Sequence, residues 1–222
     1  MYKKMYVFVL AAAMTASYAQ AQISIGPRAG FSLTNYDVRW DGKKPDKDER
    51  GNLKPGIIIG VTGEYALNEA MAFQSGVIFA MQGTRYKSSE RHQFFGTTVT
   101  TTVMNVNYLQ VPVNALYKVK LGGMKLVLQA GPYFGVALDG KTKSTDDNDG
   151  LTNTEETKIE FGNKLGQMKR LDLGVGAGAG LQFGHFRTAL GYNFGVANLS
   201  NFDKVIQRNT GLTLSLTFLF GK

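Results

Sequence analysis

The 222-residue sequence contains no cysteine. A chain without cysteine cannot form a disulfide framework or carry a lipid on a cysteine, so neither kind of covalent anchor is expected. Histidine is also scarce, with two residues, and tryptophan occurs once. A catalytic site built on histidine therefore has few places to lie.

Long apolar runs are missing after the first residues of the chain. Two lysines precede an apolar run over residues 5–16, and Ala19-Gln20-Ala21 then offers the small-x-small pattern of a secretory cleavage site. A retained membrane helix needs roughly 20 apolar residues, and this run is shorter. We therefore expect residues 1–21 to be a cleaved signal peptide and residues 22–222 to form a single domain.

Clustered positive charge is missing as well. The chain has 25 lysine and arginine residues against 17 aspartate and glutamate residues, for a formal net charge of +8. These cations are scattered along the sequence and are not grouped with aromatic residues. Nucleic-acid binding normally shows a basic face or stripe, so no nucleic-acid partner is expected.

What the sequence does contain is alternation, and the clearest case is residues 210–220. One face of this stretch carries large apolar side chains, namely Leu212, Leu214, Leu216, Phe218 and Phe220. The opposite face carries small hydroxyl side chains, namely Thr213, Ser215 and Thr217. A period of two residues is typical of a β-strand, and this pairing of faces favours a strand of an outer-membrane barrel. The stretch also resembles the C-terminal aromatic strand that marks outer-membrane proteins for assembly.

Seven further segments alternate in the same way: residues 23–36, 57–67, 71–86, 101–121, 125–138, 171–183 and 186–197. Three two-residue turns, at 68–69, 122–123 and 184–185, alternate with four long polar connections, at 37–54, 87–98, 139–168 and 198–207. Both ends of the domain fall on the side of the short turns. The sequence thus predicts an all-β fold, an eight-stranded antiparallel up-and-down transmembrane β-barrel with short periplasmic turns and long extracellular loops. A soluble β-sandwich would explain neither the aromatic-rich outer faces nor the two kinds of connection.

If the apolar faces point to lipid, the opposite faces bring five charged residues into the lumen. They are Arg28, Glu64, Lys118, Asp172 and Arg187. The interior of an eight-stranded barrel is just wide enough for side chains to fill, and an unpaired buried charge is costly. We therefore expect a lumen charge network that plugs the barrel, with an ion path or proton relay as the alternative.

Two short motifs point to a family. The stretch Ile25-Gly26-Pro27-Arg28-Ala29-Gly30-Phe31-Ser32-Leu33-Thr34-Asn35 and the stretch Tyr108-Leu109-Gln110-Val111-Pro112-Val113 resemble the PorT-like outer-membrane β-barrel family. Members of that family often carry glutamate where this chain has Gln110. The resemblance implies an eight-stranded barrel of the same general kind as the OmpA membrane domain, and it implies a link to protein secretion.

The long connections supply candidates for contact and for metal binding. Trp40, Phe94 and Phe95 are candidate contact residues in extracellular loops, because aromatic side chains supply contact area. Asp147, Asp149 and Glu156 match part of the calcium-loop spacing, but Thr145 stands at its first position and no helices flank it. The expectation is a solvated acidic loop, with no bound metal and no cofactor.

These observations favour a structural or partner-docking surface protein. The expected surroundings are outer-membrane lipid and lipopolysaccharide, with a protein partner reached through the long extracellular loops. A small transport channel is the main alternative. A surface enzyme is not expected, because His92 beside Ser88, Ser89 and Glu90 lacks the sequence context of a strained nucleophile turn.

Overall fold

The computed structural model describes residues 22–45, 51–92, 96–148 and 151–221, and all regular secondary structure within them is β-strand. The predicted signal peptide lies outside these residues. The strands are β1 (Ile23–Trp40), β2 (Lys54–Ala66), β3 (Met71–His92), β4 (Gly96–Leu121), β5 (Met124–Asn148), β6 (Leu151–Lys158), β7 (Leu171–Phe183), β8 (Phe186–Gly195) and β9 (Val205–Phe218).

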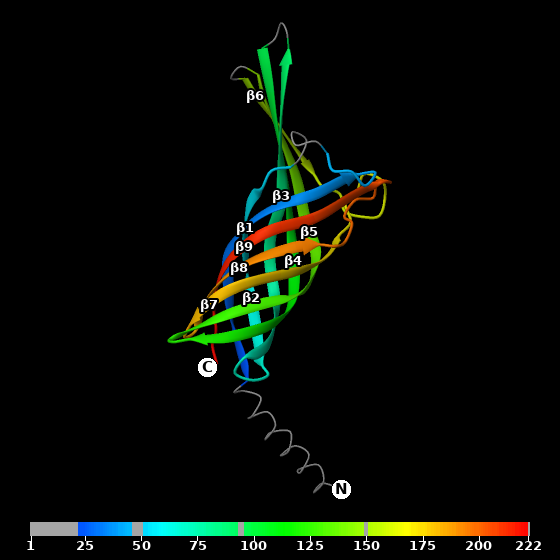
Figure 1. Cartoon of the computed structure of the whole chain (residues 1–222). Coiled ribbons are helices and arrows are strands. Elements are labelled where there is room, and N and C mark those ends of the chain that lie inside the picture. Colours follow the sequence, from blue (N-terminus) through cyan, green and yellow to red (C-terminus); the bar gives the residue numbers. More distant parts are fainter. Residues whose placement is uncertain (1–21, 46–50, 93–95, 149–150, 222) are drawn as a thin grey trace, which may run out of the picture.

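Eight of these strands close into a ring in which every neighbouring pair is antiparallel. The order runs β4-β3-β2-β1-β9-β8-β7-β5, and a further pairing of β4 with β5 closes the circle (Figure 1). The strand β6 pairs only with β5 and stands outside the ring. The predicted eight-stranded antiparallel barrel is confirmed.

The wall of the barrel is apolar outside and polar inside. Phe31 and Leu214 are register partners on β1 and β9, and they are 68% and 56% exposed. Between them in the alternation lie buried polar residues such as Ser32 and Ser215. Period two places successive side chains on opposite faces, so the alternating sequence forces this arrangement once the ring closes. An apolar outer face of this kind is suited to lipid.

No helix in the described part of the chain is long and apolar enough to cross a membrane.

The short turns and the two chain ends of the barrel lie together at one end (Figure 1). The turns at Gly122-Gly123 and Gly184-His185 join directly paired residues, and Gly122 and Gly184 adopt φ values of 61° and 55°. Glycine accepts a positive φ without steric cost, which explains both tight turns. The third connection is longer than the predicted two residues. Ala66 pairs with Ala72 across it, and the Asn68 side chain accepts hydrogen bonds from two backbone N–H groups within it.

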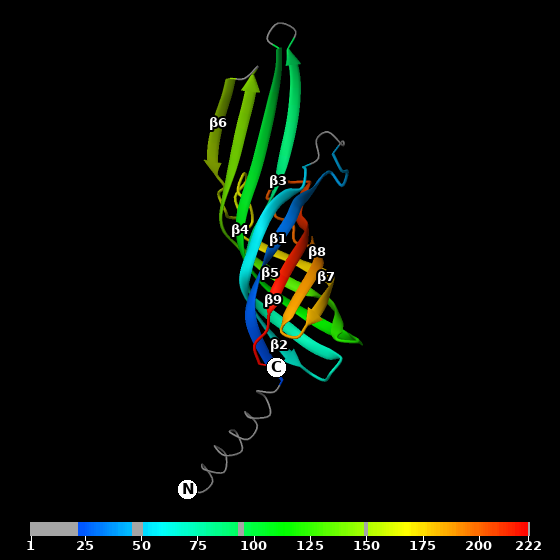
Figure 2. The ribbon, with the colours of Figure 1, turned by 90° about the vertical axis from the view of Figure 1, so that its left-hand side faces the viewer.

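Two of the predicted loops are in fact largely strand. Residues 87–92, together with 96–98, extend the hairpin of β3 and β4, while residues 139–148 and 151–158 form the end of β5 and all of β6. The ends of β3, β4 and β5 together with β6 make a sheet beyond the barrel, at the end where long connections of outer-membrane barrels are expected to face outward, and we call it the extracellular extension (Figures 1 and 2). Both segments are polar on both faces, so they show no hydrophobic alternation. Threonine nevertheless has a high strand propensity, and cross-strand pairs stabilise the extension.

Candidate functional site

Three of the five predicted lumen charges form one buried cluster near the short-turn end. Glu64 of β2 accepts hydrogen bonds from Lys118 of β4 and from Arg187 of β8, with 2.6 Å between Arg187 Nη2 and Glu64 Oε2. All three side chains are at most 3% exposed. Arg187 also donates to the Gln182 side chain at 2.6 Å. One carboxylate thus holds two cations from strands that are not neighbours in the ring.

The other two predicted lumen charges are also buried but lie outside this cluster. Arg28 makes no ion pair with any described residue, and its Nε atom has no hydrogen-bond partner there. Asp172 accepts a hydrogen bond from Asn209 at 2.7 Å and from the Tyr133 hydroxyl at 3.3 Å. The predicted lumen charges thus comprise one ion cluster of three residues, with Arg28 and Asp172 apart from it. Strand alternation determined that these residues face inward, but amide and phenol groups satisfy Asp172 instead of a cation.

The extracellular end of the lumen is closed by a small hydrophobic core. Tyr36, Val106 and Tyr108 come from the wall, and Met168 and Leu199 come from the connections that follow β6 and β8. Backbone bonds tie these connections to each other and to the wall, from Lys169 N to Leu199 O at 2.9 Å and from Leu199 N to Gln207 O of β9 at 2.8 Å. Two cavities inside the described wall have volumes of about 50 and 10 Å³. Side chains thus fill most of the interior.

The extracellular extension carries rows of hydroxyl and amide groups. On one face Thr100 donates to Asp146 at 2.7 Å, and Thr102 lies 3.2 Å from Ser144. All eight residues of β6 are exposed. On one side β6 pairs with β5, and no described residue pairs with its other side. The extension is a sheet with an open edge.

The predicted acidic loop does not bring its candidate ligands together. Asp147 is opposite Thr152, whereas Glu156 is opposite Lys143 and forms an ion pair with Lys141. The hydrogen bond and the charge of Lys141 lower the pKa of the Glu156 carboxyl. Asp149 lies outside the described residues. Within the residues that are described, no group of three or more metal-ligating side chains gathers at one point.

The predicted aromatic contact residues have different outcomes. Trp40 ends β1 and is 60% exposed. Phe94 and Phe95 lie outside the described residues, as does the side chain of His92. The second histidine, His185, lies in a turn at the opposite end, where its Nδ1 atom is 2.9 Å from the Leu219 carbonyl oxygen.

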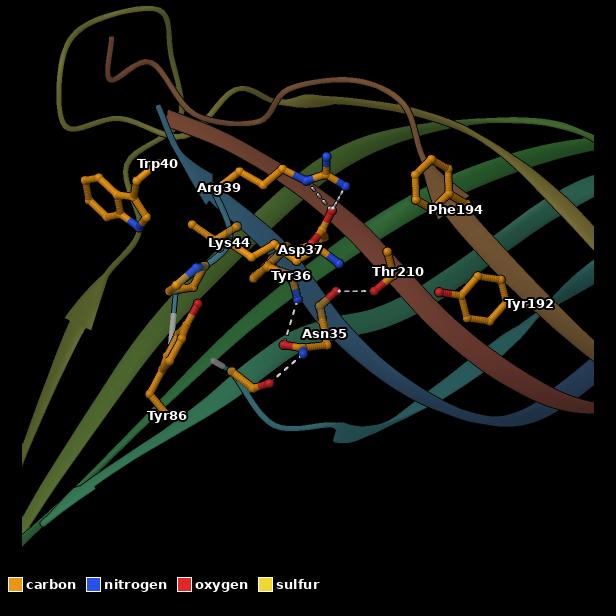
Figure 3. A pocket seen from close by; sticks show the side chains of 13 residues that line it. Asn35, Tyr36, Asp37, Arg39, Trp40, Lys44, Tyr86, Tyr192, Phe194 and Thr210 are labelled. Atoms are coloured by element: carbon orange, nitrogen blue, oxygen red, sulfur yellow. Dashed lines mark hydrogen bonds and ion pairs between the residues drawn. The ribbon is translucent and has the colours of Figure 1, made fainter. Parts of the chain in front are cut away.

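A groove of about 670 Å³ on the outer wall was not predicted from the sequence. Its lining residues include Asp37, Arg39 and Trp40 of β1, Lys44 of the next connection, and Tyr192 and Phe194 of β8 (Figure 3). We call it the outer-rim groove. The sequence did not predict this groove, because its residues come together only once the strand register places β1, β9 and β8 side by side. One feature of the sequence does indicate a polar site here, because the outward positions of β1 change from apolar to charged residues after Leu33.

Hydrogen bonds and ion pairs order one side of the outer-rim groove. Asp37 Oδ2 lies 3.1 Å from Arg39 Nη2, and Asp37 Oδ1 lies 3.6 Å from Lys44 Nζ. Asn35 donates from its side chain to the Gly51 carbonyl at 2.6 Å, which ties β1 to the connection between β1 and β2 (Figure 3). Thr210 donates to the Asn35 carbonyl at 3.3 Å. The polar side of the groove is therefore held in place before any ligand arrives.

Comparisons with known proteins identify one family and several similar solved structures. The sequence matches the family described as outer membrane protein beta-barrel domain over residues 18–201. Similar solved structures include Ail, the attachment invasion locus protein of Yersinia pestis, at 18% identity and a TM-score of 0.37, with 90% of this chain and 99% of that chain covered. OprG of Pseudomonas aeruginosa matches at 12% identity and 0.44, covering 90% and 97%. Neisserial surface protein A matches at 12% and 0.40, covering 88% and 96%. A comparison with curated proteins found no match.

Proposed function

Because the chain belongs to the outer membrane protein β-barrel family, we propose that it is a small outer-membrane protein that docks a protein partner through its extracellular extension. The barrel anchors the chain in the membrane, and the extension carries the contact surface. An extended segment of the partner pairs with the free edge of β6, as in other cases of strand addition to an exposed sheet edge.

The observation that carries this proposal is the open edge of β6. A strand at the edge of a sheet presents a row of unpaired N–H and C=O groups, which is a template for another strand. The N–H of Ile159 donates to the Gly140 carbonyl at 2.9 Å. Because hydrogen-bonding residues alternate along an antiparallel strand, the N–H groups of Thr152, Thr154 and Glu156 point away from β5. These groups are available to a partner.

The filled lumen supports docking over transport, and the proposal gives the chain no catalytic role. The larger of the two cavities described inside the wall, of about 50 Å³, has room for only a few water molecules. We also infer that the chain is PorT-like, on the two motifs around Arg28 and Gln110. Both residues are buried in the wall. A link to protein secretion would then identify the partner as a component of a secretion machine.

A photocrosslinking experiment in cells tests the docking. A photoreactive amino acid replaces Thr152, whose side chain lies on β6 beside the open edge. It is introduced alone, together with Thr154→Pro, and together with Thr154→Ala. Proline removes the N–H that faces the partner without removing a bond to β5, and alanine keeps that N–H. We expect one discrete crosslinked species that persists in the alanine variant and is lost in the proline variant.

A crosslinked species that survives Thr154→Pro would contradict strand addition at this edge. If no species forms, although the protein is folded and exposed at the cell surface, the docking proposal itself is wrong. Folding is checked by the change in gel mobility between unheated and boiled samples, since a folded barrel migrates differently from an unfolded chain.

A further inference from the structure

The outer-rim groove lies where the outer wall changes from lipid-facing to polar. Asn35 pairs with Thr210, and Thr210 pairs with Phe194, so these side chains share the outer face with Leu33 and Leu212 two positions below. Leu33 and Leu212 are 43% and 40% exposed and belong to the apolar wall. The groove therefore sits on the outer wall directly above the apolar belt.

The groove combines cations with aromatic rings. Arg39 and Lys44 both pair with a single carboxylate, that of Asp37, so the described residues that line the groove carry one more cation than carboxylate. Arg208, the register partner of Asp37 on β9, adds a third cation nearby, and its Nε atom has no hydrogen-bond partner among the described residues. Across the groove stand Tyr192 and Phe194 (Figure 3).

We propose that the outer-rim groove binds the phosphorylated sugar headgroup of a glycolipid in the outer leaflet. Arg39 and Lys44 contact a phosphate, since guanidinium and ammonium groups form charge-assisted hydrogen bonds with phosphate oxygens. The rings of Trp40, Tyr192 and Phe194 cover the apolar faces of the sugar. The acyl chains run down the wall along Leu33 and Leu212.

The position of the groove argues for a lipid over a soluble anion. A headgroup held here keeps its chains against exposed apolar side chains, so burial of the chains adds to the polar contacts. Aromatic residues with one apolar and one polar end are suited to the level of the headgroups. A free phosphate ion would gain only the contacts with the two cations.

The single tryptophan of the chain makes the groove directly observable. Trp40 lines it, so its fluorescence reports binding there and nowhere else in the protein. The full mature protein in detergent micelles is titrated with lipid A carrying both phosphates, with the same lipid after enzymatic removal of the phosphates, and with inorganic phosphate. We expect saturable binding of the phosphorylated lipid and about a hundredfold weaker binding of the dephosphorylated lipid, because the contacts of both Arg39 and Lys44 are lost and each is worth about tenfold.

Variants separate the groove from general membrane affinity. Arg39→Gln combined with Lys44→Gln should weaken binding of phosphorylated lipid about a hundredfold, about tenfold for each cation, and should leave binding of the dephosphorylated lipid unchanged. Lys120→Gln is the matched control, because Lys120 is an exposed cation paired with Glu69 at the opposite end of the barrel. It should bind like the wild type. Gel mobility before and after boiling verifies that each variant is folded.

Equal affinity of the wild type for both forms of the lipid would overturn the proposal, as would equal loss of binding in Lys120→Gln. Binding of inorganic phosphate as tight as that of lipid A would also overturn it, since the site would then recognise an anion and not a lipid. These outcomes do not depend on whether the free edge of β6 docks a partner.

Discussion

At the scale of single residues, Glu64 holds the buried charges at the short-turn end together. It is the only carboxylate in contact with Lys118 and Arg187 among the described residues, and all three are almost fully buried. Removing one member of a buried ion cluster leaves its partners unpaired, and that cost is larger than the net stabilisation of the intact cluster.

Glu64→Gln should therefore lower the free energy of unfolding by about 3–5 kcal/mol, because two desolvated cations lose their carboxylate. Urea unfolding of the protein in lipid vesicles, followed by gel mobility, measures the change. Arg28→Met is the informative comparison. Arg28 has no carboxylate partner among the described residues, so an apolar replacement should leave stability within about 1 kcal/mol of the wild type or raise it. A loss of several kcal/mol in Arg28→Met, or none in Glu64→Gln, would contradict this account of the lumen.

At the scale of elements, β7 contributes a row of glycines to the inner wall. The residues are Gly174, Gly176, Gly178 and Gly180. A side-chain carbon added at Gly174 would overlap the ring of Tyr133, whose hydroxyl donates a hydrogen bond to Asp172. The absence of a side chain on β7 thus leaves the space in which a large residue of β5 crosses the lumen.

Gly174→Ala should destabilise the barrel by about 1–3 kcal/mol, since overpacking forces the ring from its position. Gly123→Ala provides the control in the same unfolding assay. An added carbon at Gly123 meets nothing within 4 Å, so this change should alter stability by no more than about 0.5 kcal/mol. If Gly174→Ala behaved like the control, Tyr133 would not need the space.

At the scale of the whole molecule, the lumen is blocked twice, by the charge cluster at one end and by the hydrophobic core around Tyr108 and Leu199 at the other. Eight strands enclose an interior that side chains can fill. The two blocks come from different strands and different connections, so removing one leaves the other in place.

The wild-type protein should therefore conduct no steady current in planar lipid bilayers at any ordinary salt concentration. Leu199→Ala should also remain silent, because the cluster around Glu64 still closes the other end. Large, steady single-channel currents from the wild type would show that the interior opens and would favour the transport alternative.

The sequence predicted the ring because a period of two residues is a local signal that each strand carries by itself. It also predicted which charges face inward, since the same period determines the face of the sheet on which each side chain lies. It could not predict which charges meet, because Glu64, Lys118 and Arg187 come from three strands whose register is set by the closed sheet. The extracellular extension was missed for another reason. Residues 139–158 are polar on both faces, so their strands are recognisable only by their partners.

The extracellular extension combines a long reach with a backbone that is already ordered. From Asp139 to Asn148 the strand β5 rises about 30 Å at roughly 3.4 Å per residue, so the tip at Leu151 stands well clear of the lipid surface. Because the extracellular extension is a hydrogen-bonded sheet, its backbone is already ordered. A partner that pairs with β6 avoids most of the cost of about 1–2 kcal/mol per residue that ordering a flexible loop would impose. Height above the membrane and readiness to bind thus come from the same strands.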